Sequence, residues 1–214
     1  MQDYKTLPTL FCMKDLGIRS VVVRKYRYQK NQGKVPDHKE NILNRNFNAS
    51  TINQKWVTDI TYIYVLGEGW TYLASVMDLY DRKIIGYSYG ENMTTELAKK
   101  AVENACMNVK DTTDIILHSD LGSQYTSTVF EDMLSEKNMK HSFSRKGNPY
   151  DNACIESFHS VLKKEEVYQN TYRTFEEAQS ALFEYIESWY NRRRRHSALD
   201  YKTPQQVEDE ALAA

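Results

Sequence analysis

The chain has 214 residues, of which 41% are hydrophobic and 27% are charged, and this composition is typical of one sizeable globular domain with a modest extension. No apolar run approaches the roughly 20 residues that span a bilayer, and the first residues lack the layout of a signal peptide. We therefore expect a cytoplasmic protein with no membrane partner. The three cysteines are widely separated and indicate neither a disulfide framework nor a paired zinc site.

The net charge of −1 hides two oppositely charged parts. Residues 1–55 hold 11 Lys and Arg against 4 Asp and Glu, a net +7, and the remainder holds 17 against 25, a net −8. A basic N-terminal extension on an acidic body indicates a polyanionic partner at the front of the chain. A charge run that only increases solubility is the alternative.

The N-terminal part shows little periodicity. The stretch "FCMKDLGIRS" predicts the end of a helix within residues 1–18, with Gly17 as its C-terminal stop. Residues 19–55, with Pro36 and several asparagines, predict an extended basic linker.

Strand patterns begin at residue 56. Residues 56–65 are rich in β-branched and aromatic side chains on both faces, which predicts a strand that is covered from both sides. Two similar runs over 70–79 and 83–90 follow after short turns, so the three segments predict an antiparallel meander.

The rest of the chain alternates helical and strand patterns. We expect helices over 94–109, 126–138, 152–168 and 174–193, and short strands over 114–119 and 140–144. This order predicts an α/β fold with a mixed five-stranded sheet flanked by helices, and a ribonuclease-H-like arrangement fits it. A fold does not by itself define a function.

Three carboxylates occupy unusual positions in these elements. Asp59 lies in the middle of the first strand on a face meant for burial, where an ionised carboxylate is costly unless it is paired or bound to a metal. Asp120 ends the strand in "IILHSDLG", where α/β sheets place functional groups. Glu156 lies on the polar face of the helix over 152–168.

Each of these residues also has a simpler interpretation. Asp59 fits an edge aspartate that bonds to neighbouring backbone, Asp120 fits a turn cap, and Glu156 fits an ordinary solvated glutamate. Together, on two neighbouring strands and a helix above them, they form an all-oxygen set that suits Mg²⁺ or Mn²⁺. Two such ions activate a water or a 3′-hydroxyl against a phosphodiester. The sequence has no glycine-rich phosphate loop, which favours a nucleic-acid backbone over ATP as the substrate.

Four sequence blocks resemble a known family. Asp59, Asp120 and Glu156, with 35 residues between the last two, resemble the DD(35)E signature of retroviral integrases and bacterial insertion-sequence transposases. The blocks "WVTDITYI", "LHSDLGSQYTS", "SRKGNPYDNACIESFHSVLKKE" and "YNRRRRHSALDYKTPQQ" are similar to those of the OrfB-type, second-reading-frame transposases. The resemblance covers residues 50–207.

The resemblance implies a domain organisation and an activity. Residues 50–207 would form an integrase-type catalytic core with a C-terminal helical block, and residues 1–49 a truncated helix-turn-helix remnant and basic linker. Asp59, Asp120 and Glu156 would bind two Mg²⁺ ions, or Mn²⁺ as a substitute, when DNA is bound. The chain would cleave DNA at element ends and transfer the 3′-hydroxyl to target DNA. Its partners would be DNA, further copies of itself on DNA, and the DNA-binding subunit from the first reading frame.

Several residues are candidate DNA contacts. Lys163, two helical turns after Glu156 on the same face, occupies the position of the family's DNA-contacting basic residue. The other candidates lie on the loop before the helix, near Asp120, or in basic clusters: Lys164, Arg145, Lys146, Asn148, Tyr150, Gln124, Arg192 and Arg193. His118 is a candidate supporting residue next to Asp120, and a structural histidine is the alternative.

Two other functions stay open at this point. A ribonuclease-H-like nuclease would hydrolyse DNA without joining it. A catalytically silent, truncated protein would bind DNA or interfere with transposition, because the N-terminal recognition segment is short.

Overall fold

The computed structural model describes residues 16–17, 40–145 and 148–213. Most of the predicted N-terminal helix end and basic linker, including Cys12, lies outside the described residues, as does Lys146. Gly17 is described and has a φ of 67°, the left-handed conformation that favours glycine at a helix C-terminus.

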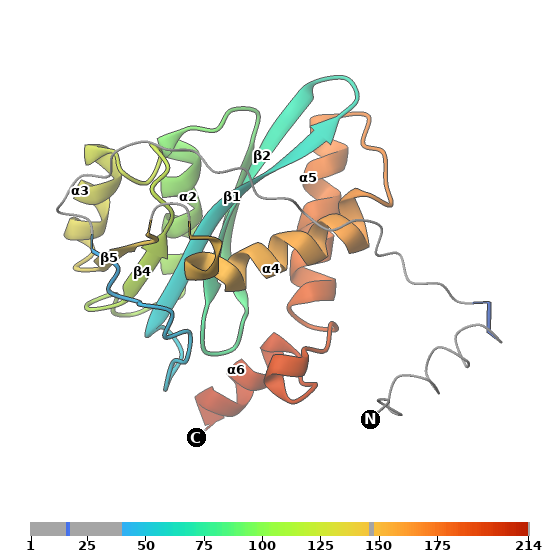
Figure 1. Cartoon of the computed structure of the whole chain (residues 1–214). Coiled ribbons are helices and arrows are strands. Elements are labelled where there is room, and N and C mark those ends of the chain that lie inside the picture. Colours follow the sequence, from blue (N-terminus) through green and yellow to red (C-terminus); the bar gives the residue numbers. More distant parts are fainter. Residues whose placement is uncertain (1–15, 18–39, 146–147, 214) are drawn as a thin grey trace.

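The fold is built on one mixed sheet of five strands in the order β3-β2-β1-β4-β5 (Figure 1). The strands are β1 (Lys55–Val65), β2 (Gly69–Asp78), β3 (Ile84–Gly90), β4 (Ile116–Ser119) and β5 (Lys140–Phe143). The first three form an antiparallel meander, and β4 and β5 add to β1 in parallel. The predicted mixed sheet and all of its predicted strands are confirmed.

β1 and β4 stay together over only a short distance. β4 pairs with residues 55–57 of β1, whereas β2 pairs with β1 along residues 56–65. Asp59 therefore lies two residues beyond the last pair with β4, and Asp120 follows the last residue of β4. Both aspartates lie where these two neighbouring strands separate.

Helices cover both faces of the sheet. α2 (Thr95–Cys106) and α3 (Thr128–Glu136) pack on one face, and α4 (Ala153–Leu162) and α5 (Phe175–Glu184) pack on the other (Figure 1). Alternation along β1 sends Trp56 to the first layer and Val57 to the second, and both are fully buried. Since each such buried side chain contributes roughly 1.5–3 kcal/mol, burial on both faces explains why the first part of the run over 56–65 forms a strand. Tyr62 and Tyr64 are about half exposed, so the predicted cover on both sides is wrong for the end of the strand.

The helices α4 and α5 each continue into a π-helix. A 3₁₀ turn, η1 (Pro149–Asn152), leads into α4, which continues as a π-helix, η2 (Lys163–Val167). α5 likewise continues as a π-helix, η3 (Tyr185–Tyr190). The predicted helices over 152–168 and 174–193 are confirmed as continuous helical segments.

The chain ends in a 3₁₀ turn, η4 (Ser197–Leu199), and a helix, α6 (Pro204–Ala213), that the sequence did not predict. Only Pro204 of α6 is buried, so its sequence carries no apolar period to reveal it. An ion pair between Lys83 and Glu208 ties it to the start of β3.

No helix in the described part of the chain is long and apolar enough to cross a membrane.

β3 packs so closely on α2 at Gly86 that a side chain there would collide with the helix backbone. A Cβ there would lie 2.4 Å from the carbonyl oxygen of Ala101 and from the backbone nitrogen of Ala105. We expect Gly86→Ala to lower the free energy of unfolding by about 2 kcal/mol, because backbone atoms cannot move aside as a side chain can. Urea unfolding measures this.

Gly90→Ala is the matched control on the same strand. Its Cβ would meet only the end of the Leu97 side chain, at 3.1 Å. Equal destabilisation by the two substitutions would contradict the close-packing explanation.

Candidate active site

Asp59 points into the layer between β1 and α4. It lies opposite Ser75 of β2, and its side chain is 24% exposed. Its Oδ1 accepts a hydrogen bond from the backbone N–H of Ile60 at 2.8 Å, and its Oδ2 lies 3.5 Å from Nδ1 of His159. The carboxylate is therefore half-enclosed and faces the helix that carries Glu156.

Asp120 lies in the turn that leaves β4. Its Oδ1 accepts the backbone N–H of Gly122 at 2.9 Å, so the predicted turn cap is confirmed. A Cβ at position 122 would lie 2.9 Å from Asp120 Oδ1 and from Gln124 Oε1, so a larger residue here would displace one or both of these side chains. Asp120 is an exposed residue, yet the surrounding protein displaces enough water from its carboxyl to raise the pKa to about 6, and the charge of Asp59 adds to this rise.

Glu156 projects from the exposed face of α4, as its helix position predicts. Partial loss of water raises the pKa of its carboxyl to about 7, and the charges of Asp59 and Asp120 contribute. The charge of Asp59 thus raises the pKa of both other carboxyls, and the charge of Asp120 raises that of Glu156. The structure brings the three predicted carboxylates close enough to repel one another.

The carboxylates do not form a preassembled metal cage. Within the described residues, no group of three or more His, Cys, Asp or Glu side chains is arranged to hold an ion. The donors are all oxygen and mutually repulsive, which is the chemistry that Mg²⁺ relieves. The residues fit a divalent cation in charge and donor type.

His159 is a site residue that sequence reasoning missed. It lies on α4 three residues after Glu156, and it is only 6% exposed. Its Nδ1 faces Asp59, and its Nε2 lies 3.4 Å from the hydroxyl of Ser75. The sequence could have revealed it, because His159 follows Ile155 by four residues and therefore lies on the buried face of the helix. A polar side chain on such a face requires a polar partner.

Lys163 lies near Asp59 and over the ring of Tyr62, and its predicted contact with DNA stays a prediction. Its Nζ is 3.8 Å from the centroid of the Tyr62 ring. Loss of water lowers the pKa of its ammonium group, and the nearby charge of Asp59 opposes that change. Lys164 follows it in η2 and is half-buried.

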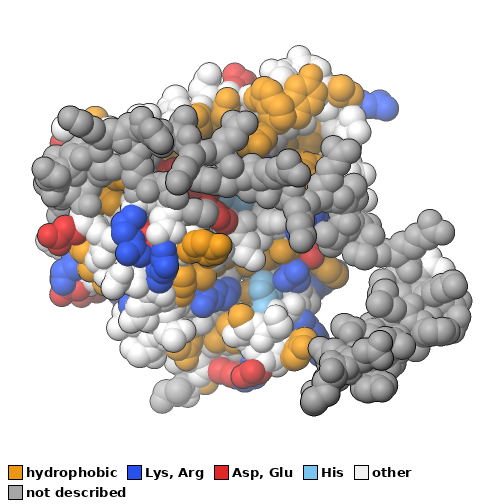
Figure 2. Space-filling view, in the orientation of Figure 1, with side chains coloured by type: hydrophobic (Ala, Val, Ile, Leu, Met, Phe, Trp, Pro, Cys, Tyr) orange, Lys and Arg blue, Asp and Glu red, His pale blue; other side chains and the backbone are white. Residues whose placement is uncertain are grey.

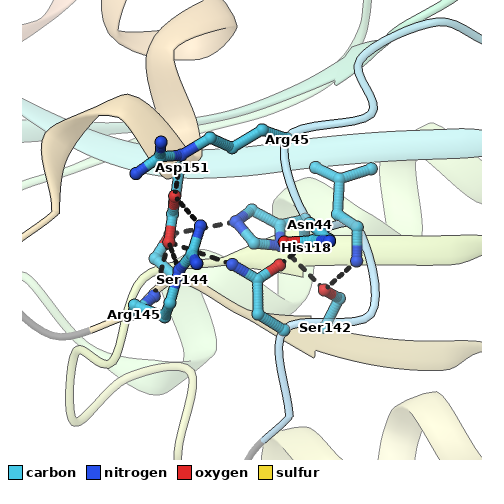
Figure 3. A network of polar contacts seen from close by, with 9 residues as sticks. Asn44, Arg45, His118, Ser142, Ser144, Arg145 and Asp151 are labelled. Carbon is cyan, nitrogen blue, oxygen red and sulfur yellow. Dashed lines mark hydrogen bonds and ion pairs between the residues drawn. The ribbon is translucent and has the colours of Figure 1, made fainter.

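A buried network anchored on Asp151 holds the start of α4 (Figure 3). The carboxylate accepts hydrogen bonds from Asn41 at 2.9 Å, from Arg45 at 2.7 Å, and from Arg145 at 2.9 and 3.0 Å. Burial alone would raise the pKa of this carboxyl, but the bonds from Arg145 and Arg45 outweigh it and hold the pKa far below its usual range. The segment before β1 and the loop before α4 are thereby joined.

His118 belongs to the same region and links β4 to β5. Its Nδ1 lies 2.8 Å from the hydroxyl of Ser142 and its Nε2 lies 2.9 Å from that of Ser144 (Figure 3). Burial lowers its pKa to about 4, so the ring is neutral at neutral pH. Both ring nitrogens thus have partners other than Asp120, which favours the structural histidine, and a supporting role for His118 beside Asp120 stays a prediction.

The predicted DNA contacts on the loop before α4 differ in how free their side chains are to reach a ligand. Arg145 is half-exposed, but its guanidinium and backbone N–H bond to Asp151. Asn148 precedes η1, and Tyr150 is exposed, with the guanidinium of Arg45 at 5.8 Å from its ring centroid.

The remaining candidates lie at the site or at the C-terminal end. Gln124 lies beside Asp120 and donates to the carbonyl of Met93 at 3.5 Å. Arg192 and Arg193 are exposed beyond η3 and form no ion pair with any residue that the structure describes. Their binding to DNA stays a prediction.

Comparison with known proteins identifies the family. The chain matches the family Integrase core domain over residues 49–149 and again over residues 137–204. It is 40% identical over 184 residues to the transposase for insertion sequence element IS904 of Lactococcus lactis, covering 86% of this chain and 72% of that protein. It is also 40% identical over 197 residues to transposase InsF for insertion sequence IS3A of Escherichia coli, covering 92% of this chain and 68% of that protein.

Solved structures share the fold. A chain from the simian T-cell lymphotropic virus intasome, solved in complex with the PP2A regulatory subunit B56 gamma, superposes with a TM-score of 0.61 at 17% identity, covering 86% of this chain and 60% of that one. The HTLV-2 integrase catalytic core domain, solved with magnesium, gives a TM-score of 0.55 at 16% identity, covering 74% and 98% of the two chains. The expected ribonuclease-H-like fold and the resemblance read from the sequence blocks are confirmed. The chain belongs to the insertion-sequence transposases that carry an integrase core domain.

Proposed function

We propose that this chain is the catalytic subunit of a DNA transposase. It cleaves phosphodiesters at the ends of a mobile element and transfers the freed 3′-hydroxyl to target DNA. The convergence of Asp59, Asp120 and Glu156, in a chain of this family, is the observation that carries the proposal. Residues 50–207 serve as the catalytic core, and residues 1–49 as the helix-turn-helix remnant and basic linker.

Asp59, Asp120 and Glu156 hold two Mg²⁺ ions in this proposal, with Mn²⁺ as a substitute. The bound ions supply activation of a water or 3′-hydroxyl and stabilisation of the leaving oxygen. A relative in fold, the HTLV-2 integrase core, was solved in complex with magnesium, which supports the choice of ion.

The chain's own side chains orient the site and the DNA. His159 positions the Asp59 carboxylate from the α4 side, and the turn at Gly122 keeps the Asp120 carboxylate uncovered. Lys163 binds a phosphate next to the reacting group, and the exposed Arg192 and Arg193 bind the backbone farther away. We further propose that copies of the chain assemble on DNA in the cytoplasm, together with the first-reading-frame DNA-binding subunit.

Asp120→Asn tests the chemistry directly. With Mg²⁺ and a labelled element-end duplex, we expect the wild type to form joined products and the variant to lose at least about 100-fold in rate, because a metal-binding charge is removed. Gel electrophoresis separates the products. Cleavage without joining by the wild type would indicate the hydrolytic nuclease instead, and binding without either reaction would indicate a silent DNA-binding protein.

Glu156→Gln tests the mutual repulsion of the carboxylates through stability. Raised pKa values mean that the unfolded chain loses these protons first, so metal-free stability falls as pH rises from about 4 to about 7. We expect the variant to melt about 1–2 °C above the wild type at pH 7.5 without metal, since both groups are solvent-screened.

Added Mg²⁺ should reverse this order in thermal melts. The wild type gains stability by binding the ion, while the variant has lost a ligand. A variant that melts at the wild-type temperature without metal, and responds equally to Mg²⁺, would contradict the proposed site.

His159→Phe tests the positioning role. We expect the rate of strand transfer at saturating DNA to fall about 10- to 100-fold, since displacement of a reacting carboxylate by a fraction of an ångström has effects of this size. His159→Asn keeps a side-chain nitrogen near the position of Nδ1 and should recover much of the rate. Single-turnover kinetics measure both, and equal rates for the two variants would exclude the positioning role.

A further inference from the structure

Three aromatic side chains form an exposed patch on the hairpin of β1 and β2. Tyr62, Tyr64 and Trp70, here called the hairpin patch, are 52%, 50% and 55% exposed. The Trp70 ring contacts both tyrosine rings edge-to-face, with centroids 5.1 and 5.2 Å apart. Figure 2 shows hydrophobic side chains gathered at the upper right, over this hairpin.

The patch has no covering element among the described residues. On the opposite face of the same hairpin, Ile63 and Val65 are fully buried in the core under α4 and α5. The helices α2 and α3 bury Trp56 and Ala74 nearer the other end of the strands. Since three adjacent exposed aromatic rings are costly in water, the patch indicates a binding surface.

The patch lies on the face of β1 opposite to Asp59, and Lys163 links the two at the edge of the strand. Tyr62 follows Asp59 by three residues on a strand whose edge β4 has already left. Lys163, whose ammonium lies over the Tyr62 ring, also lies in the field of Asp59. Lys163 thus lies between the Tyr62 ring and the Asp59 carboxylate.

A cation beside exposed rings matches the chemistry of an unpaired nucleotide. The phosphate pairs with the ammonium, and the base stacks on an aromatic face. Bases inside a duplex cannot bind in this way, because their faces are already stacked on neighbouring base pairs. The combination therefore favours single-stranded DNA over duplex DNA, and it favours DNA over an apolar protein partner, which would bury the Lys163 charge at a cost.

We propose that the hairpin patch binds unpaired bases of the DNA strand next to the phosphodiester that the carboxylates address. Trp70 is the main stacking platform, Tyr62 and Tyr64 support it, and Lys163 binds the adjoining phosphate. The inference rests on the proposed function in taking DNA as the substrate and the carboxylates as the place of reaction, but base binding by the patch requires no reaction.

Binding of the full chain to synthetic DNA tests the proposal. Fluorescence anisotropy in EDTA compares a blunt duplex with the same duplex extended by a short unpaired thymidine run, at either the 3′ or the 5′ end. We expect one of the extended duplexes to bind about tenfold more tightly than the blunt one. Because no metal is present, this preference can be observed even if no cleavage or joining ever occurs, so the two proposals fail separately.

Substitutions of Trp70 test whether the hairpin patch causes the preference for extended over blunt duplexes. Trp70→Ala should abolish the preference and leave blunt-duplex affinity within about twofold, whereas Trp70→Phe, which retains an aromatic face, should keep most of it. Phe183→Ala is the matched control, because Phe183 is an aromatic side chain of α5 with a similar exposure of 57%. Thermal melts establish that each variant is folded.

Three outcomes would overturn the proposal. The first is equal affinity of the wild type for blunt and extended duplexes. The second is a preference that survives in folded Trp70→Ala. The third, measured by sedimentation, is a wild-type dimer that Trp70→Ala dissociates without any change in preference, which would assign the patch to contacts between copies of the chain.

Discussion

The separation of β1 from β4 after Val57 is the constraint on which the rest of the site depends. The two central strands run parallel for three residue pairs, and beyond that point β1 continues only as one arm of a hairpin with β2. The gap opened in this way receives Asp59 from the strand that continues and Asp120 from the turn of the strand that ends. α4 then crosses above it and supplies Glu156 and His159 (Figure 1). The same unpaired edge leads to the hairpin patch.

The pKa of Asp151 is shifted in the opposite direction from those of Asp120 and Glu156. Asp151 is buried but receives bonds from Asn41, Arg45 and Arg145, so its charge is stabilised and its pKa is lowered. Among the described residues Asp120 accepts only the backbone N–H of Gly122 and Glu156 has no cationic partner, so loss of water and mutual repulsion prevail and their pKa values rise. The Asp151 network fixes the start of α4, and burial of the apolar face of that helix holds its middle. This packing holds Asp59, Asp120 and Glu156 near one another despite their mutual repulsion.

Local patterns were sufficient for most of the fold. The strands of the sheet and the burial of both faces at the start of β1 follow from side-chain types and their alternation within a few residues. α6 was missed because it buries almost nothing, and the π-helical turns were not anticipated because they depend on contacts between helices. Glu165 of η2, for example, accepts hydrogen bonds from Tyr185, Trp189 and Arg194, which lie 20, 24 and 29 residues later in the chain.

The sequence by itself determined the type of sheet, the three carboxylates and the family, because alternating side chains and spaced motifs are local features of the chain. Only the tertiary structure decided what surrounds those carboxylates. It placed His159 against Asp59, committed Arg145 to Asp151, gave His118 two serine partners on or next to β5, and left the hairpin patch uncovered. Each of these depends on residues far apart in the chain, whose distances and shared loss of water arise only when the sheet and its helices pack together.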